Sequence, residues 1–129
     1  MTTTLFVYGT LKRGGSNHYH LAEQTFHGPA RTEAGFTLFS LGAYPGLVVA
    51  PTDTHGVTGE LWSVDAACLA RLDLLEGLNE GLYRRAPIAI LHSISPTEAA
   101  ESRRIFVAET YFYLRDLSGH PHLGATWLV

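Results

Sequence analysis

The feature that most restricts how this chain can fold is the frequency with which glycine and proline interrupt its apolar runs. The 129 residues include 13 glycines and 6 prolines. Both residue types favour turns and weaken the interiors of helices and strands. The apolar runs left between them have the length of strands. We therefore expect several strands joined by turns, with few helices.

The first of these runs indicates the centre of a sheet. Residues 5–8 are Leu-Phe-Val-Tyr, and the run stops at Gly9. An unbroken apolar run of this length is typical of a strand that is buried on both faces. Further strands are predicted within residues 31–41, 47–50, 57–64, 88–91 and 105–113.

Two polar stretches and one proline limit those strands. Pro87 has no amide hydrogen for a sheet, so it marks either the start of a strand or an edge strand. Residues 93–102 have the composition of a polar loop, and the tail after Asp116 is rich in Gly, His and Pro. We expect both stretches to be irregular.

One helix is predicted clearly, over residues 66–77. Asp65 is a good N-cap and Gly77 a good terminating residue. At about 100° per residue the helix places its apolar side chains on one arc that should face the core. These side chains belong to Cys68, Leu69, Leu72 and Leu75. A second, shorter helix is expected over residues 17–24, capped by Asn17.

Glu76 falls on the same apolar arc, about 20° from the position of Asp65. An unpaired carboxylate in apolar surroundings is costly, and it usually responds with a raised pKa. The position also allows a frayed last turn, in which Glu76 reaches water just before Gly77. The sequence leaves both interpretations open.

The loop after the first strand, Tyr8-Gly9-Thr10-Leu11, is a candidate anion site. Successive N–H groups that leave a strand end can hold a carboxylate or an oxyanion, and glycine lets a ligand approach the main chain. The spacing matches neither nucleotide-binding glycine motif, so we predict no such cofactor. An ordinary glycine turn explains the same residues.

Histidine could support a metal-dependent hydrolase. His18, His20 and His27 lie close together in the sequence, but no H-E-x-x-H motif occurs. We predict no metal site and keep a metal-dependent hydrolase as the weakest functional hypothesis, behind the two that are described at the end of this subsection.

Two further residues could carry chemistry and have simpler explanations. Cys68 is the only cysteine, and its place on the apolar arc favours a small buried side chain over a nucleophile. Glu60 shares a strand face with Trp62 and could act as a supporting acid. A glutamate in contact with solvent is the simpler interpretation of that position.

Composition excludes several classes of protein. Hydrophobic residues make up 46% of the chain and charged residues 16%, which favours a folded chain, and the length suits one domain over residues 1–129. With 9 basic and 12 acidic side chains, no nucleic-acid partner is expected. A lone cysteine and the lack of a long apolar segment predict a cytoplasmic protein without a membrane partner. The oligomeric state cannot be read from the sequence.

Three blocks of sequence resemble the gamma-glutamylcyclotransferase-like superfamily, which includes AIG2-like proteins. The first block is Leu-Phe-Val-Tyr-Gly-Thr-Leu-Lys-Arg-Gly at residues 5–14, continued by Asn17-His18. The second is Tyr44-Pro45-Gly46. The third joins Gly-Glu-Leu-Trp at residues 59–62, Leu-Asp-Leu-Leu-Glu-Gly at 72–77 and Tyr-Arg-Arg at 83–85. The blocks occur in the order found in the family.

The resemblance implies an α+β fold, with a mixed β-barrel-like sheet and short flanking helices. It implies an enzyme that needs no cofactor and converts a gamma-glutamyl amine to 5-oxoproline and a free amine. Glu76 takes the position of the catalytic glutamate, as general acid and base. The substrate-binding residues that the resemblance implies are Tyr8, Gly9, Thr10, Leu11, Tyr44, Pro45 and Tyr83.

A non-catalytic module of the same fold remains the main alternative. It would use the Gly9 to Leu11 loop to hold a small carboxylate and would tolerate a glutamine at position 76. The leaving amine also remains open, because a gamma-glutamyl amino acid and a gamma-glutamyl-epsilon-lysine remnant both suit the resemblance.

Overall fold

The computed structural model describes residues 2–92 and 104–128. The loop predicted at residues 93–102 lies outside the described residues. The eight strands are β1 (Thr2–Val7), β2 (Thr25–Thr32), β3 (Phe36–Ser40), β4 (Pro45–Val49), β5 (Thr58–Asp65), β6 (Tyr83–His92), β7 (Arg104–Tyr113) and β8 (His122–Gly124). The helix α1 covers Ala66–Leu75, and the short 3-10 helices η1 and η2 cover His18–Leu21 and Leu78–Glu80.

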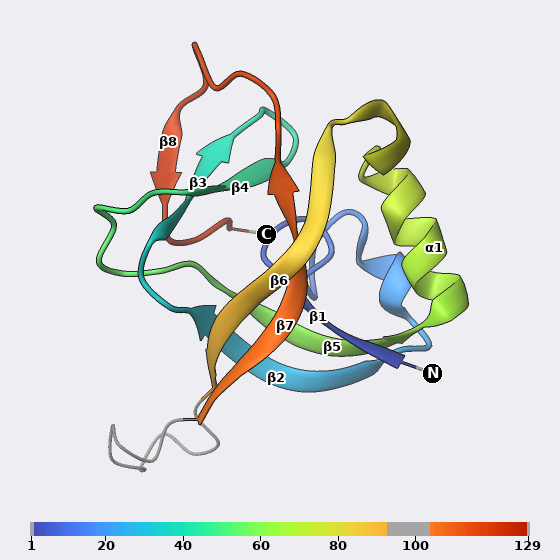
Figure 1. The fold of residues 1–129 in the computed structure, drawn as a ribbon. Coiled ribbons are helices and arrows are strands. Elements are labelled where there is room, and N and C mark those ends of the chain that lie inside the picture. Colours follow the sequence, from blue (N-terminus) through green and yellow to red (C-terminus); the bar gives the residue numbers. More distant parts are fainter. Residues whose placement is uncertain (1, 93–103, 129) are drawn as a thin grey trace.

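The strands form one mixed sheet that closes on itself. Their order is β1-β5-β2-β6-β7-β4-β3-β8, and a further pairing joins β1 to β7. The β1–β7 and β4–β7 pairings are parallel and the remaining pairings are antiparallel. In Figure 1 the long strands curve into a barrel-like ring, with β3, β4 and β8 on one side and α1 on the other. The expected α+β fold with a barrel-like sheet is confirmed.

Strand β1 is buried on both faces, as its apolar run predicts. Leu5 and Val7 belong to one apolar cluster together with Cys68 and Leu72 of α1. Phe6 belongs to a second cluster, which includes buried side chains of β3, β4, β6 and β7. Successive strand residues point to opposite faces of a sheet, so β1 separates two hydrophobic cores.

The helix α1 begins and ends close to its predicted limits. The carboxylate of Asp65 accepts a hydrogen bond from the main-chain N–H of Cys68 at 2.7 Å, so the predicted N-cap is confirmed. Cys68 and Leu72 are fully buried, also as predicted. Leu75 was expected to face the core, but its side chain is 41% exposed because it lies at the helix end beside a cavity.

Most of the predicted helix at residues 17–24 does not form, and it is followed by β2 (Thr25–Thr32), a strand that was not predicted. Only one 3-10 turn forms there, and the chain then enters β2. Residues of β2 alternate between exposed and half-buried, and its pairing with β5 shifts between Phe26 and Gly28. No apolar face runs along β2, and Gly28 and Pro29 interrupt its middle. Hydrophobic periodicity therefore did not predict this strand.

Strand β6 and the tail also differ from the expectation. β6 starts at Tyr83, and Pro87 lies in its interior, opposite Glu109 of β7. β2 pairs with β6 only near its far end, so the other side of β6 is an edge at Pro87, which is one of the two predicted possibilities. The tail was expected to be irregular, yet His122–Gly124 forms β8 against β3.

Gly59 of β5 gives a direct test of this packing. A Cβ atom there would lie 2.3 Å from the carbonyl oxygen of Val7 and 2.7 Å from the ring of Phe6. We expect Gly59→Ala to lower the free energy of unfolding by about 3 kcal/mol. In Gly119→Ala the Cβ atom meets open space and only the positive φ of 78° is strained, at about 1 kcal/mol. Urea unfolding of the two variants measures the difference, and equal losses would contradict this packing.

Candidate active site

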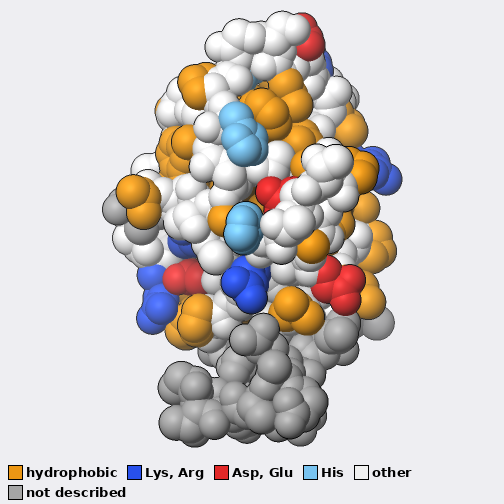
Figure 2. Space-filling view, turned by 90° about the vertical axis from the view of Figure 1, so that its left-hand side faces the viewer, with side chains coloured by type: hydrophobic (Ala, Val, Ile, Leu, Met, Phe, Trp, Pro, Cys, Tyr) orange, Lys and Arg blue, Asp and Glu red, His pale blue; other side chains and the backbone are white. Residues whose placement is uncertain are grey.

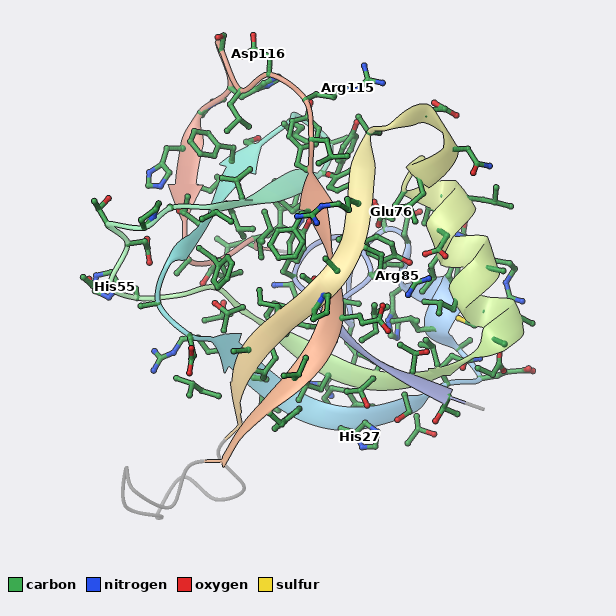
Figure 3. The ribbon with its side chains drawn as sticks, viewed as in Figure 1. His27, His55, Glu76, Arg85, Arg115 and Asp116 are labelled. Carbon is green, nitrogen blue, oxygen red and sulfur yellow. The ribbon has the colours of Figure 1, made fainter. Side chains whose placement is uncertain are left out.

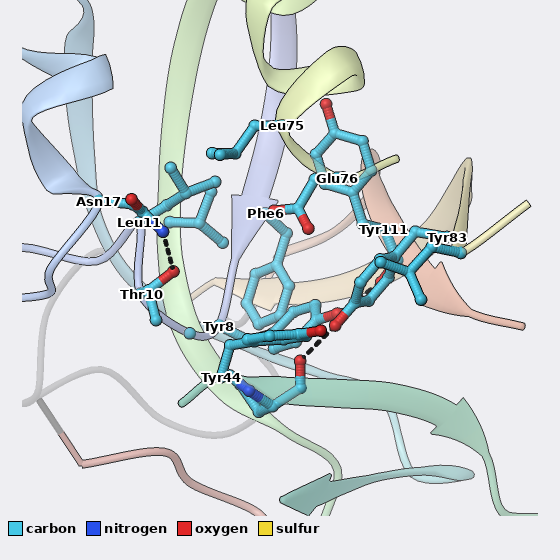
Figure 4. A pocket seen from close by; sticks show the side chains of 14 residues that line it. Phe6, Tyr8, Thr10, Leu11, Asn17, Tyr44, Leu75, Glu76, Tyr83 and Tyr111 are labelled. Atoms are coloured by element: carbon cyan, nitrogen blue, oxygen red, sulfur yellow. Dashed lines mark hydrogen bonds between the residues drawn. The ribbon is translucent and has the colours of Figure 1, made fainter. Parts of the chain in front are cut away.

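A cavity of about 210 Å³ lies where the end of β1, the start of β4 and the C-terminal end of α1 meet (Figure 4). It contains every site residue that the resemblance implies: Glu76, Tyr8, Gly9, Thr10, Leu11, Tyr44, Pro45 and Tyr83. It also contains residues that sequence reasoning did not select: Phe6, Val7, Asn17, Leu75, Leu82 and Tyr111. Asn17 was present in the first sequence block, whereas nothing local marks Tyr111.

The glycine at position 9 is explained by a contact between the loop after β1 and the start of β4. A Cβ atom at Gly9 would lie 2.7 and 2.8 Å from two ring carbons of Pro45. Such distances are too short for non-bonded carbons, so this position requires glycine. The close approach joins the loop after β1 to the start of β4 and forms one side of the cavity.

The loop from Gly9 to Asn17 is held by bonds within itself. The main-chain N–H of Asn17 donates to the carbonyl of Thr10 at 2.9 Å, and the Asn17 side-chain amide donates to the Thr10 hydroxyl at 3.0 Å. The N–H groups of Gly9, Thr10 and Leu11 have no acceptor among the described residues. These three donors at the cavity are available to a ligand.

Glu76 follows the last residue of α1, and its carboxylate points into the cavity beside Phe6 and Tyr111 (Figure 4). Its main-chain N–H donates to the carbonyl of Leu72 at 2.9 Å. Burial raises the pKa of the Glu76 carboxyl to about 7. Within residues 2–92 and 104–128, no ion pair or side-chain hydrogen bond satisfies this carboxylate. It is therefore an acid poised to gain or lose a proton near neutral pH.

Three tyrosines surround the carboxylate and hold their own protons. The Tyr8 hydroxyl donates to the carbonyl of Tyr111 at 2.7 Å, and the Tyr83 hydroxyl donates to the carbonyl of Pro45 at 2.7 Å. The Tyr111 hydroxyl donates to the carboxylate of Asp73 at 2.8 Å. Burial, with the nearby charge of Glu76 as a further cause, holds the pKa of each tyrosine above its ordinary value. The three tyrosines therefore remain neutral, and each donates its hydroxyl proton in a hydrogen bond to an oxygen of the protein.

A charged network fixes the position of Tyr111 and of the helix end. The Arg85 guanidinium donates to both carboxylate oxygens of Asp73, at 2.9 and 3.1 Å, and also contacts Glu109. The network therefore joins α1, β6 and β7, and Figure 3 shows Arg85 between β6 and α1 near Glu76. Both Asp73 and Arg85 occur in the third sequence block, where sequence reasoning gave them no role.

Glu60 corrects one sequence expectation. It was interpreted as a glutamate in contact with solvent, but it is only 8% exposed. Its carboxylate accepts hydrogen bonds from Arg13 and from the indole N–H of Trp62. The alternation of side chains along β5 correctly predicted that Glu60 shares a face with Trp62. It could not predict that the loop containing Arg13 covers this face.

The histidines considered for a metal do not share a site. A ring nitrogen of His18 lies 3.0 Å from the carbonyl of Leu11, and one of His27 lies 2.6 Å from the Ser63 hydroxyl. His27 lies far from Glu76 in Figure 3. Residues 2–92 and 104–128 contain no group of three His, Cys, Asp or Glu that could hold a metal ion.

The surface and the helices give two further observations. The face shown in Figure 2 carries Lys and Arg interspersed with acidic and hydrophobic side chains. Among the described residues, no helix is both long enough and apolar enough to cross a bilayer.

Two proteins of similar sequence are named as cyclotransferases. A Vibrio cholerae protein provisionally named a gamma-glutamylcyclotransferase is 45% identical over 88 residues, which is 68% of this chain and 73% of that protein. A Rattus norvegicus protein named gamma-glutamylaminecyclotransferase is 38% identical over 93 residues, which is 67% of this chain. The match spans 62% of the rat protein's own length.

The fold has a close counterpart among solved structures. The crystal structure of an AIG2-like protein from Mus musculus superposes with a TM-score of 0.70 and 27% sequence identity. The superposition covers 92% of this chain and 90% of the mouse chain. The two chains therefore share their overall fold.

A family model agrees with these pairwise similarities. The model described as gamma-glutamyl cyclotransferase, AIG2-like, matches residues 5–128 and so includes all the residues of the cavity. Because the match extends over nearly the whole sequence, the chain belongs to the gamma-glutamyl cyclotransferase, AIG2-like family of enzymes.

Proposed function

We propose that this chain cyclises a gamma-glutamyl amine or amide to 5-oxoproline and a free amine, with Glu76 as general base and then general acid. The observation that carries the proposal is the Glu76 carboxyl, which points into a small cavity and has a pKa raised to about 7 by burial. Among the described residues that line the cavity, Glu76 is the only carboxylic acid, and burial keeps Tyr8, Tyr83 and Tyr111 protonated by raising the pKa of each.

The proton transfer explains why the pKa of Glu76 matters. The alpha-amine of the substrate has an ordinary pKa of about 8. Moving its proton to a carboxylate of pKa about 4.5 would cost about 5 kcal/mol, whereas moving it to a carboxylate of pKa about 7 costs about 1.4 kcal/mol. Burial of Glu76 therefore removes most of the free-energy cost of deprotonating the alpha-amine, which is the nucleophile.

The remaining steps return that proton to the product. The neutral alpha-nitrogen attacks the gamma-carbonyl carbon and closes a five-membered ring. The bond from that carbon to the leaving nitrogen breaks as Glu76 gives its proton to the leaving nitrogen. The Glu76 carboxylate then accepts the second proton of the ring nitrogen and passes it to the free amine. 5-Oxoproline keeps one N–H, the amine leaves as an ammonium ion and Glu76 is regenerated, so atoms and charge balance without another reactant. Because the reaction is intramolecular, holding the glutamyl chain in a folded conformation contributes much of the rate.

The main-chain donors of Gly9, Thr10 and Leu11 suit the negative groups of this substrate. Their N–H groups can hold the substrate carboxylate or the charge that develops on the gamma-carbonyl oxygen. Of the cavity-lining side chains in the part of the chain that the structure describes, only that of Glu76 carries a charge. Neutral donors leave its pKa high, whereas a lysine or arginine beside it would lower that pKa.

The size of the cavity limits the substrate. At about 210 Å³ it is smaller than the range of roughly 300–1,000 Å³ typical of drug-sized ligands. It suits a glutamyl group, with the leaving amine near Tyr44 and Leu75, which are 38% and 41% exposed. The name of the rat relative makes gamma-glutamyl amines the first substrates to test.

The first test compares wild type with Glu76→Gln. We expect wild type to release 5-oxoproline from a panel of gamma-glutamyl dipeptides and gamma-glutamyl-epsilon-lysine, and the variant to lower kcat by about 10²- to 10⁴-fold. Glu80→Gln, at an exposed glutamate of η2, is the control and should retain the activity. Full turnover by Glu76→Gln would refute the proposal. No turnover by any protein, with 5-oxoproline still bound, would favour the non-catalytic module.

The second test is the pH dependence of the rate. Only deprotonated Glu76 can accept the proton from the substrate, so kcat/KM should rise with pH and reach half of its plateau near pH 7. Steady-state rates from pH 5 to pH 9 measure this limb. A limb centred near pH 4.5 would show that burial does not control the base.

The third test needs no substrate. The folded pKa of Glu76 lies above its unfolded value of 4.5, so the stability it contributes is complete below pH 4.5 and is lost as pH rises to about 7. Glu76→Gln avoids that loss. We expect it to be up to about 3 kcal/mol more stable than wild type at pH 8, and equal to it at pH 4. Urea unfolding at both pH values measures the difference, and the account fails if that difference does not depend on pH.

A further inference from the structure

Glu60 is a buried carboxylate outside the cavity whose hydrogen bonds have no role in the mechanism above. In β5 it lies opposite Val7 of β1, two residues before the loop that begins at Gly9. Burying a carboxylate is costly unless hydrogen bonds replace its water. Here three donors do so, and two of them come from one residue of that loop.

The hydrogen bond from the main-chain N–H of Arg13 to Glu60 shows how the loop is held. One carboxylate oxygen of Glu60 accepts the main-chain N–H of Arg13 at 3.0 Å and the indole N–H of Trp62 at 3.2 Å. The other oxygen accepts from the Arg13 guanidinium at 3.1 Å. A side chain that binds main-chain N–H fixes the path of the backbone, so Glu60 ties the middle of the loop to the sheet.

The surrounding rings hold the same assembly together. The Arg13 guanidinium lies 3.9 Å from the centre of the Phe26 ring, and the Phe26 and Trp62 rings are 5.1 Å apart. His18, at the other end of the loop, lies 5.4 Å from Trp62 and contacts the carbonyl of Leu11. Bonds within the loop set its shape, while Glu60 and these rings set its place on the sheet.

We propose that Glu60 is a positioning residue for substrate binding, which holds the loop so that the free N–H groups of Gly9, Thr10 and Leu11 stay at the cavity. This inference rests on the proposed function. Glu60 does not line the cavity, and the hydrogen bonds of its carboxylate go to Arg13 and Trp62, not to Glu76. Its loss should therefore weaken binding and leave the proton transfer unchanged.

The experiment uses Glu60→Ala, Glu60→Gln and Arg13→Ala, with 5-oxoproline as the binding probe. Glu60→Ala removes every acceptor, and we expect KM and the Kd for 5-oxoproline to rise about 10- to 100-fold. Glu60→Gln keeps one acceptor oxygen for the Arg13 N–H and should rescue most of that loss. Arg13→Ala keeps its main-chain N–H and should have a smaller effect than Glu60→Ala. Glu23→Ala removes an exposed glutamate before β2 and is the matched control.

The pH profile separates positioning from other roles. In all of these variants the pH at half-maximal kcat/KM should equal that of wild type, and kcat should stay within about threefold. Normal KM and normal 5-oxoproline binding in folded Glu60→Ala would overturn the inference. So would a shifted pH midpoint with unchanged binding, because Glu60 would then act on the acid.

Two further readouts keep the test decisive. If Glu60→Ala does not fold, the comparison rests on Glu60→Gln and Arg13→Ala. A larger rise in the Kd for 5-oxoproline in Arg13→Ala than in Glu60→Gln would show that the guanidinium, not the main-chain contact, is responsible, and would overturn the inference. If Glu76→Gln abolishes turnover while the Glu60 variants bind normally, only the positioning role fails. If Glu76→Gln remains active, the proposed function fails, and 5-oxoproline binding still decides the role of Glu60.

Discussion

The burial of β1 on both faces is the constraint on which the site depends. Leu5 and Phe6 are fully buried in different cores, so the strand cannot shift without disturbing both. The chain leaves this strand at Tyr8, whose hydroxyl donates to β7 at Tyr111 and accepts the N–H of Leu47 in β4. The glycine loop and the start of β4 therefore meet beside a fixed point, and the cavity forms there.

The chemistry of the cavity follows from what surrounds its one carboxylate. Glu76 lies among apolar and aromatic side chains, and burial alone raises its pKa. The Arg85 guanidinium, which lies near Glu76 in Figure 3, is paired with Asp73 and Glu109. Its charge is thus compensated by carboxylates other than Glu76. This pairing leaves an acid that can exchange a proton near neutral pH, next to neutral main-chain donors.

Local patterns predicted the parts of this arrangement that depend on neighbours in sequence. The apolar run of β1, the N-cap of α1 and the place of Glu76 on the apolar arc could each be read from a few consecutive residues. The partners of those elements could not. Tyr111 and Asp73 are 38 residues apart, and Arg13 and Glu60 are 47 residues apart. Such contacts depend on the order of the strands in the sheet, which cannot be read from hydrophobic alternation or helical spacing. The cavity residues were predicted only through the resemblance of the sequence blocks to a known family.

The central claim is that burial makes Glu76 an acid that titrates at neutral pH. Its most direct measurement is the carboxyl ¹³C chemical shift of Glu76 as a function of pH, assigned by the loss of that signal in Glu76→Gln. The account predicts a midpoint near pH 7, in agreement with the folded pKa of about 7. A midpoint near 4.5, the ordinary value for glutamate, would show that water reaches the carboxylate freely and would contradict the account.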